Sequence, residues 1–307
     1  ESEKRLVELK MENEFALEKE QIALEQEKKD LASAEALKRS EIIRNAFIVG
    51  FILILVLAIV SFRAFKNKKR ANQEIAEKNR EITDSINYAE RLQEAILSPS
   101  NKTDEDLKDL FVLFQPKDIV SGDFYWIEHN EIDDSVLFAA IDCTGHGVPG
   151  AMLSIVGNNA LESIHTMRVA KPHLILEKLN DIVYTKLKVQ GSREMRDGMD
   201  AAFCRVDRKK MTLEFAGANN PAYIVRHGKV ITCRGTKRAI GQEPEVEFDG
   251  SVIDLIKGDC VYVFSDGYSD QFGGPKGKKM GSKRFKEYLI EISDLDMDAQ
   301  RKSLSDI

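Results

Sequence analysis

Hydrophobic and polar positions follow four different patterns along the 307 residues of this chain. Residues 1–44 are rich in Glu, Lys, Leu and Ala and contain neither Gly nor Pro, a composition that favours a helix. Leu17, Leu24 and Leu31 lie seven residues apart, as in one seam of a coiled coil. The other seam positions are largely polar, so the pattern fits a paired helix and a single solvated helix continuing an upstream sensor region about equally well.

The second pattern is an apolar run, because residues 46–62 contain no charged side chain. A helix extended to Phe65 covers about 30 Å, close to the thickness of the hydrocarbon core of a bilayer. Basic residues follow it at Arg63, Lys66, Lys68, Lys69 and Arg70. The N-terminal flank also carries basic residues, namely Lys38, Arg39 and Arg44. We predict one transmembrane helix at residues 45–65 with its C-terminal side in the cytoplasm.

The third pattern, over residues 66–98, is that of a second polar helix. Ile75, Ile82, Ala89 and Ile96 are seven residues apart, which indicates a short heptad repeat between the membrane and the next domain. Two readings follow from it. The helix is either a passive spacer or a signalling linker that pairs with a second copy of the chain in a homodimer.

Residues 107–307 carry the pattern of a globular domain. Strand-like apolar runs occur at LFVLF, SVLFAAID, AAFCRVD, LEFAGA, AYIVR and CVYVFSD, separated by turns such as RHGK. Helical patterns occupy roughly residues 149–166, 172–188 and 282–293. Because strands mostly follow one another while helices come in pairs, the domain is predicted to be α+β with antiparallel sheet.

Net charge, cysteine spacing and missing motifs argue against several classes of protein. The net charge of −6 argues against nucleic acid as the main partner. Four cysteines without C-x-x-C spacing are typical of free thiols in a reducing compartment. None of the five histidines lies in the linker helix, so the phosphoacceptor of a sensor histidine kinase is missing. The glycine-rich stretch GHGVPGAML lacks the Gly-Lys-Ser/Thr of a nucleotide-binding phosphate loop.

Three carboxylates stand beside glycines at the ends of strand-like runs: Asp123 after Gly122, Asp142 before the loop CTGHG, and Asp266 before Gly267. Carboxylates gathered without basic partners repel one another, so a divalent cation is the natural counter-charge. Oxygen ligands favour Mg²⁺ or Mn²⁺ over zinc. The alternative is that Asp and Gly are simply common in turns. His146, in the same loop, is a candidate acid or base or else a solvated histidine.

A resemblance joins these features. The stretches PKDIVSGDFYW, IDCTGHGVPGAMLS, DGMDAAFC, FAGANNPAYIVR and VYVFSDGYSD occur in this order. Together they resemble the SpoIIE-type branch of the metal-dependent (PPM-type) serine/threonine phosphatases, over about residues 107–293. The preceding helices and membrane span resemble bacterial membrane-bound members of that family. The resemblance implies two antiparallel β-sheets sandwiched between helices, with two metals at one edge.

The resemblance also assigns roles to residues. Asp142 is similar to the ligand that bridges both metals, and Cys143 would offer its backbone carbonyl. Asp123 and Asp266 are similar to the first and the late acidic ligands. Asp200, and less clearly Asp197, lie where some relatives bind a third metal. His146 departs from the pattern of eukaryotic relatives, in which a histidine follows Asp-Gly directly, so its catalytic role stays open.

By resemblance, the protein is expected to be a single-pass protein of the bacterial inner membrane with a cytoplasmic phosphatase domain. It would hydrolyse phosphoserine or phosphothreonine with water activated by two Mn²⁺ or Mg²⁺ ions, and its substrate could be an antagonist in a partner-switching pathway. The alternative is a phosphatase-like scaffold or binding module without catalysis.

The C-terminal end departs from the family. Members close with an Asp-Asp pair before a final strand, and one of these carboxylates completes the metal site. Here Asp294, Asp296 and Asp298 lie in or after a helical stretch. We therefore expect residues 107–307 to lack this ligand and an edge strand, and to bind metal weakly.

Overall fold

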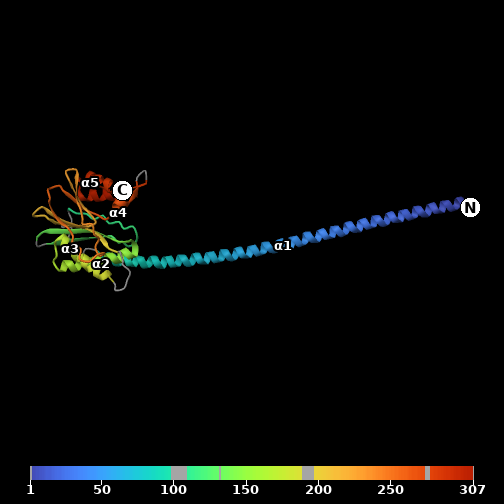
Figure 1. The fold of residues 1–307 in the computed structure, drawn as a ribbon, viewed down its shortest axis with the longest axis horizontal. Helices are drawn as coiled ribbons and strands as arrows, with labels where there is room; N and C mark the ends of the chain where they lie inside the picture. Colours follow the sequence, from blue (N-terminus) through green and yellow to red (C-terminus); the bar gives the residue numbers. More distant parts are fainter. Residues whose placement is uncertain (1, 98–108, 131–132, 189–196, 274–276, 307) are drawn as a thin grey trace. The chain divides into compact units, whose positions relative to one another are not determined.

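The computed structural model describes residues 2–97, 109–130, 133–188, 197–273 and 277–306 (Figure 1). The chain forms two compact units, Glu1–Arg80 and Glu81–Ile307. One helix, α1 (Ser2–Leu97), makes up the described part of the first unit and the beginning of the second.

Helix α1 covers all three N-terminal patterns without a break, as expected of a sequence rich in Ala, Leu, Glu and Lys. The division of this helix into three functional segments stays a prediction. Within it, one stretch is long and apolar enough to cross a membrane, judged by length and composition only. Its large side chains, including Phe51, Ile54 and Leu57, are exposed.

The second unit contains a five-stranded antiparallel sheet in the order β1-β2-β3-β4-β7. Its strands are β1 (Phe124–Asn130), β2 (Ser135–Cys143), β3 (Met199–Asp207), β4 (Thr212–Ala218) and β7 (Gly250–Asp254).

A second, three-stranded antiparallel sheet has the order β6-β5-β8. It is built from β5 (Ala222–Arg226), β6 (Lys229–Cys233) and β8 (Cys260–Val263). The RHGK turn predicted from sequence joins β5 to β6, with positive φ angles at His227 and Gly228. Strands β9 (Phe272–Gly273) and β10 (Lys278–Lys279) form a separate small hairpin.

Alternating side chains organise the unit into four layers. On β3, Ala201 and Phe203 join the core under the helices, while Ala202 and Cys204 face the core between the two sheets. On the other side, Tyr223 of β5 packs with the C-terminal helices. Figure 1 shows the strands between α2 and α3 on one side and α5 on the other. The predicted α+β sandwich of antiparallel sheets between helices is confirmed.

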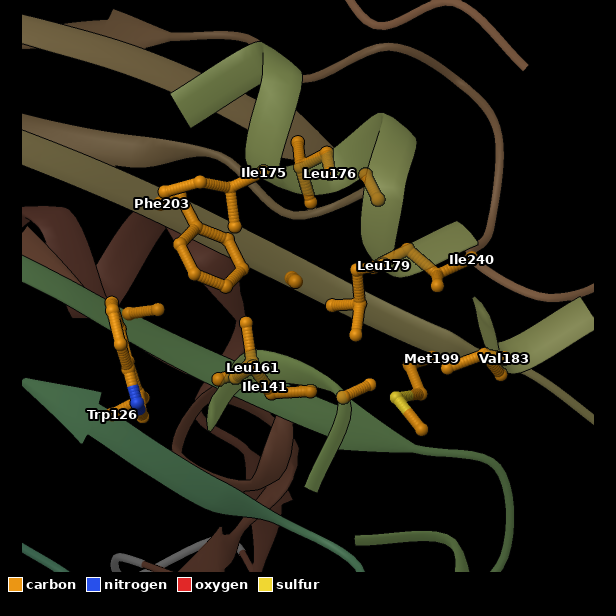
Figure 2. Close-up of a cluster of buried hydrophobic side chains, with 14 of the residues drawn as sticks. Trp126, Ile141, Leu161, Ile175, Leu176, Leu179, Val183, Met199, Phe203 and Ile240 are labelled. Carbon is orange, nitrogen blue, oxygen red and sulfur yellow. The ribbon is translucent and has the colours of Figure 1, made fainter. Parts of the chain in front are cut away.

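Helices α2 (Gly147–Thr166) and α3 (Pro172–Leu187) cover the first sheet. Figure 2 shows Leu161 of α2 and Leu179 of α3 gathered with Ile141 and Phe203 of the sheet. The C-terminal helices are α4 (Gly267–Asp270), α5 (Gly281–Ile292) and α6 (Met297–Ser305).

Two sequence expectations can be compared directly with this fold. The strand predicted at LFVLF, residues 110–114, is wrong, because this segment has no ladder partner. Phe111 and Leu113 instead pack against the core under α5 and α6, which explains their apolar character. The four cysteines are buried free thiols, in agreement with the composition argument.

Candidate metal centre

The register of the first sheet places three carboxylates in one row. Asp142 on β2 and Asp200 on β3 are direct cross-strand partners. Asp123 comes immediately before Phe124, which pairs with Ile141, so Asp123 lies opposite Asp142 just beyond the end of the ladder. Besides burial, the charge of Asp123 is close enough to contribute to the raised pKa of Asp142. Like charges on adjacent strands destabilise a sheet, so this row requires a compensating group.

The second sheet supplies the fourth carboxylate of the site. Asp266 follows β8, and its backbone N–H lies 3.5 Å from Oδ2 of Asp142. Gly267 brings the same turn towards Asp123, because a β-carbon at Gly267 would lie 3.9 Å from Oδ2 of Asp123. The packing of the two sheets therefore joins side chains from residues more than a hundred positions apart.

Glycines let three backbone segments meet beneath the carboxylates. A β-carbon on Gly122 would lie 2.7 Å from the carbonyl oxygen of Gly145, and one on Gly150 would lie 2.5 Å from the same atom. Gly145 itself has φ +88°, a conformation that favours glycine. The loop after β2 thus packs directly on the start of β1 and on the first turn of α2. The small residues of GVPGAMLS permit this close packing.

Electrostatics in the site are dominated by negative charge. Burial, together with Asp123 and Asp266, raises the pKa of Asp142 to about 8. Partial burial, followed by Asp270 and Asp123, raises the pKa of Asp266. Burial raises the pKa of Asp200 as well. A cation placed among these groups would reverse the effect of the repulsion.

The donors present fit a hard divalent cation. They are carboxylate oxygens, the ligands that Mg²⁺ and Mn²⁺ prefer. Burial raises the pKa of the Cys143 thiol, which keeps it neutral, so this residue could contribute only its backbone carbonyl. Among the residues that the structure describes, no three His, Cys, Asp or Glu side chains converge into a complete ligand set. The carboxylates are close neighbours, but their oxygens would have to move closer together to bind one cation.

His146 has a partner that the sequence analysis did not identify. Its Nδ1 lies 2.7 Å from Oδ2 of Asp118, and both side chains are accessible to solvent. His146 immediately precedes α2 in an extended conformation. In this contact a proton on Nδ1 would be donated to the carboxylate of Asp118. Only the motif PKDIVSGD hinted at Asp118, and nothing in the sequence indicated that it faces His146.

Comparisons with known proteins identify the family. The family described as Stage II sporulation protein E (SpoIIE) matches residues 132–306, more than half of the chain. This chain belongs to the SpoIIE family. Its fold is that of the PPM, or PP2C, phosphatases. No curated protein sequence matches the chain significantly.

Several solved structures are similar to this SpoIIE-family chain. The SiaA-PP2C domain of Pseudomonas aeruginosa is 29% identical with a TM-score of 0.65, over 74% of this chain and 89% of that domain. The RsbU and RsbW domains of Rv1364c from Mycobacterium tuberculosis are 17% identical with a TM-score of 0.49, over 61% and 50% of the two chains. The PP2C domain of SpoIIE from Bacillus subtilis, with a regulatory fragment, is 20% identical with a TM-score of 0.46, over 60% and 52%.

Two further carboxylates from the sequence analysis of this SpoIIE-family chain are Asp197 and Asp296. Asp197 precedes Gly198, whose carbonyl accepts hydrogen bonds from the backbone and side chain of Thr144. The metal role of Asp197 stays a prediction. Asp296 begins α6 by accepting a hydrogen bond from the N–H of Ala299, so it is a helix cap rather than a strand-end ligand.

The end of α1 also contacts this region, which the sequence did not predict. The amide of Gln93 is 6% exposed and binds both backbone groups of Ser121: Nε2 donates to its carbonyl at 2.6 Å, and Oε1 accepts from its N–H at 3.1 Å. Nε2 also lies 2.8 Å from Oγ of Ser154 in α2. Ser121 is two residues before Asp123, so the helix directly supports the segment that carries a carboxylate of the row.

Proposed function

We propose that this chain is a membrane-anchored, metal-dependent protein serine/threonine phosphatase of bacterial signal transduction. The observation that carries the proposal is the row of Asp123, Asp142 and Asp200, joined by Asp266 from the second sheet. Carboxylates gathered at one edge of the sheets repel one another and would destabilise a PP2C fold. Their presence is explained if they bind cations.

In this proposal the carboxylates have separate tasks. Asp142, the most central of them, would bind both of two Mn²⁺ or Mg²⁺ ions. Asp123 and Asp266 would be further carboxylate ligands, and Cys143 would contribute its backbone carbonyl. When bound, such ions lower the pKa of water and neutralise the charge of a phosphoryl group. Asp200 would orient water bound to the ions or bind a further ion.

A side chain of this protein would protonate the leaving group. His146, whose Nδ1 contacts Asp118, lies in the loop after β2. When both of its ring nitrogens carry a proton, it could donate the Nε2 proton to the departing serine or threonine oxygen and become neutral. The exposure of both side chains fits a group that meets a protein substrate at the surface.

The substrate is proposed to be a phosphoprotein, such as a small phosphoserine-bearing antagonist in a partner-switching pathway. One similar structure carries RsbU and RsbW domains in a single protein. That arrangement belongs to the relative, and it motivates a search for an equivalent partner of this chain.

The apolar stretch of α1 is proposed to anchor the protein in lipid, because its large side chains are exposed and need an apolar surrounding. The basic residues after Phe62 support the proposal that the phosphatase domain lies on the cytoplasmic side of the bacterial inner membrane. Further along the helix, Ile75 and Ile82 are each 57% exposed. A parallel homodimer seam through these positions would cover them.

The linker is proposed to control activity as well as to tether the domain. Gln93 lies on the same helix as the proposed seam and binds Ser121 next to Asp123. A rotation or displacement of the helix would therefore change the support of a metal-binding segment.

A phosphatase-shaped scaffold without catalysis is the second candidate. The observation that favours it is the lack of a converged ligand set among the described residues. The two candidates differ in a measurable property, since a scaffold would bind a phosphoprotein without releasing phosphate.

The test uses the whole protein in detergent micelles, with phosphoserine and phosphothreonine peptides and a titration of Mn²⁺ or Mg²⁺. We expect phosphate release that EDTA abolishes and that Asp142→Asn reduces by at least about 100-fold, in line with the loss of a metal-bridging group. Asp298→Asn is the matched control, because Asp298 is 93% exposed on α6. Metal-independent turnover, or wild-type turnover in Asp142→Asn at saturating metal, would refute the two-metal assignment. Peptide binding without any turnover would favour the scaffold.

A further inference from the structure

The row of carboxylates ends in an amide. β3 and β4 pair from Ala201 and Ala218 onwards, so Asn219 is the next position across the sheet from Asp200. Nδ2 of Asn219 donates a hydrogen bond to Oδ1 of Asp200 at 2.7 Å. Read across four strands, the row is therefore Asp123, Asp142, Asp200 and Asn219, with acceptors at three positions and a donor at the fourth.

The backbone of Asn219 is held in an uncommon conformation. Its φ is +58°, which Asn tolerates better than most residues. Its N–H donates to the carbonyl of Thr236 at 2.8 Å, and the N–H of Thr236 donates back to the carbonyl of Gly217 at 2.8 Å. A β-carbon on Gly217 would lie 2.3 Å from the carbonyl oxygen of Asn220, so the turn is closely packed. These contacts hold the backbone of Asn219, and therefore its side-chain amide, in a fixed position.

Electrostatics explain why an amide suits this position. Asp266 repels Asp200 across the site, while the hydrogen bond from Asn219 favours the charged form of Asp200. A Lys or Arg at position 219 would also stabilise Asp200, but its charge would compete with a cation for the carboxylates. An Asp would add a further repulsive charge. A neutral donor can orient one oxygen of Asp200 and leave the negative charge of the site intact.

We propose that Asn219 is a positioning residue that holds Asp200 by one oxygen and so turns the other towards the cations bound at Asp142. The inference rests on the proposed metal-dependent phosphatase function. It assigns to the FAGANNPAYIVR stretch a task in the site, beyond ending β4. Supporting groups of this kind typically change metal affinity or activity by about 10–100-fold when they are removed.

The main test variant is Asn219→Gly, which accepts a positive φ without strain and removes only the amide. His227→Gly is the matched control, because His227 also has a positive φ, of 48°, but lies in the β5–β6 turn. Mn²⁺ binding to the whole protein is measured by electron paramagnetic resonance without substrate, and kcat and KM are measured with a phosphoserine peptide. In Asn219→Gly we expect Mn²⁺ affinity at one or more sites and kcat to fall about 10–100-fold, with KM for the peptide little changed. The control should match wild type.

A reciprocal exchange separates positioning from a structural role. In Asp200→Asn with Asn219→Asp, a hydrogen bond between the two positions can form again, but the carboxylate is moved to the outer position. We expect thermal stability close to wild type without recovery of Mn²⁺ affinity or kcat. Recovery of both would overturn the positioning role in favour of a structural one.

The outcomes also separate this inference from the proposed function. Wild-type protein that binds Mn²⁺ and releases phosphate, together with an unchanged Asn219→Gly variant, would overturn only the role of Asn219. Wild-type protein that neither binds Mn²⁺ nor releases phosphate would overturn both.

Discussion

Replacing Asp142 with Asn should stabilise the metal-free protein while it removes metal-dependent activity. Burial and the neighbouring carboxylates raise the pKa of Asp142 from its ordinary value of 3.8 to about 8. The folded protein therefore binds this proton more tightly than the unfolded chain does. The cost of ionising Asp142 is absent below pH 3.8, grows as the pH rises, and is complete at about pH 8. Asn has nearly the same shape and carries no charge to repel Asp123 and Asp266.

The size of the effect follows from the pKa difference. Each unit of pKa difference corresponds to about 1.4 kcal/mol, so at pH 7.5 the upper limit for Asp142 is about 5 kcal/mol. Asp142 is only half-buried, so solvent screens part of that cost. We expect a gain in unfolding free energy of about 1–3 kcal/mol. For a domain of this size that is a rise of roughly 3–8 °C in Tm.

Trp126 offers a direct assay, because it is the single tryptophan of the chain and is 6% exposed in the core of the phosphatase unit. Its fluorescence reports thermal unfolding in EDTA at pH 5, 6.5 and 8, for wild type, Asp142→Asn and the control Asp298→Asn. Wild type should lose stability as the pH rises relative to Asp142→Asn. Added Mn²⁺ should stabilise wild type and leave Asp142→Asn nearly unchanged.

Two results would refute this reasoning. An equal or lower Tm for metal-free Asp142→Asn at pH 8 would show that repulsion among the carboxylates does not strain the fold. A difference between wild type and variant that did not depend on pH would show that the stability change comes from packing rather than from ionisation.

Three further predictions concern the linker and the loop. Ile82→Asp should place a charge in the proposed seam and convert dimer to monomer by sedimentation in micelles; an unchanged mass would leave the helix as a tether. Gln93→Leu should lower metal affinity and kcat by roughly tenfold without changing the dimer, because Ser121 loses both hydrogen bonds, and full activity would argue against coupling through this contact. Gly150→Ala should lower stability by about 1–3 kcal/mol, since its methyl group would lie 2.5 Å from the carbonyl oxygen of Gly145. Gly273→Ala, with open space around it, should have little effect on the same unfolding curve.

The sequence by itself determined the local structure and the chemical character of this protein. The apolar run AAFCRVD predicted a strand, and the helical pattern at 172–188 matches α3 to within a residue at its C-terminal end. Asp123, Asp142 and Asp266 could be recognised because each lies near the end of a strand-like run and within three residues of a glycine, which is a local signal. The family resemblance then implied the layered fold and the metal-binding roles of these carboxylates.

Only the tertiary structure decided which groups meet. Strand register aligned Asp142 with Asp200 and carried the row on to Asn219, and sheet packing brought Asp266 to Asp142 from 124 positions away. The contact of Gln93 with Ser121 depends on how the helix packs against the domain. Side-chain periodicity repeats over two to four residues, so it specifies which face of an element is buried but not which distant element covers it.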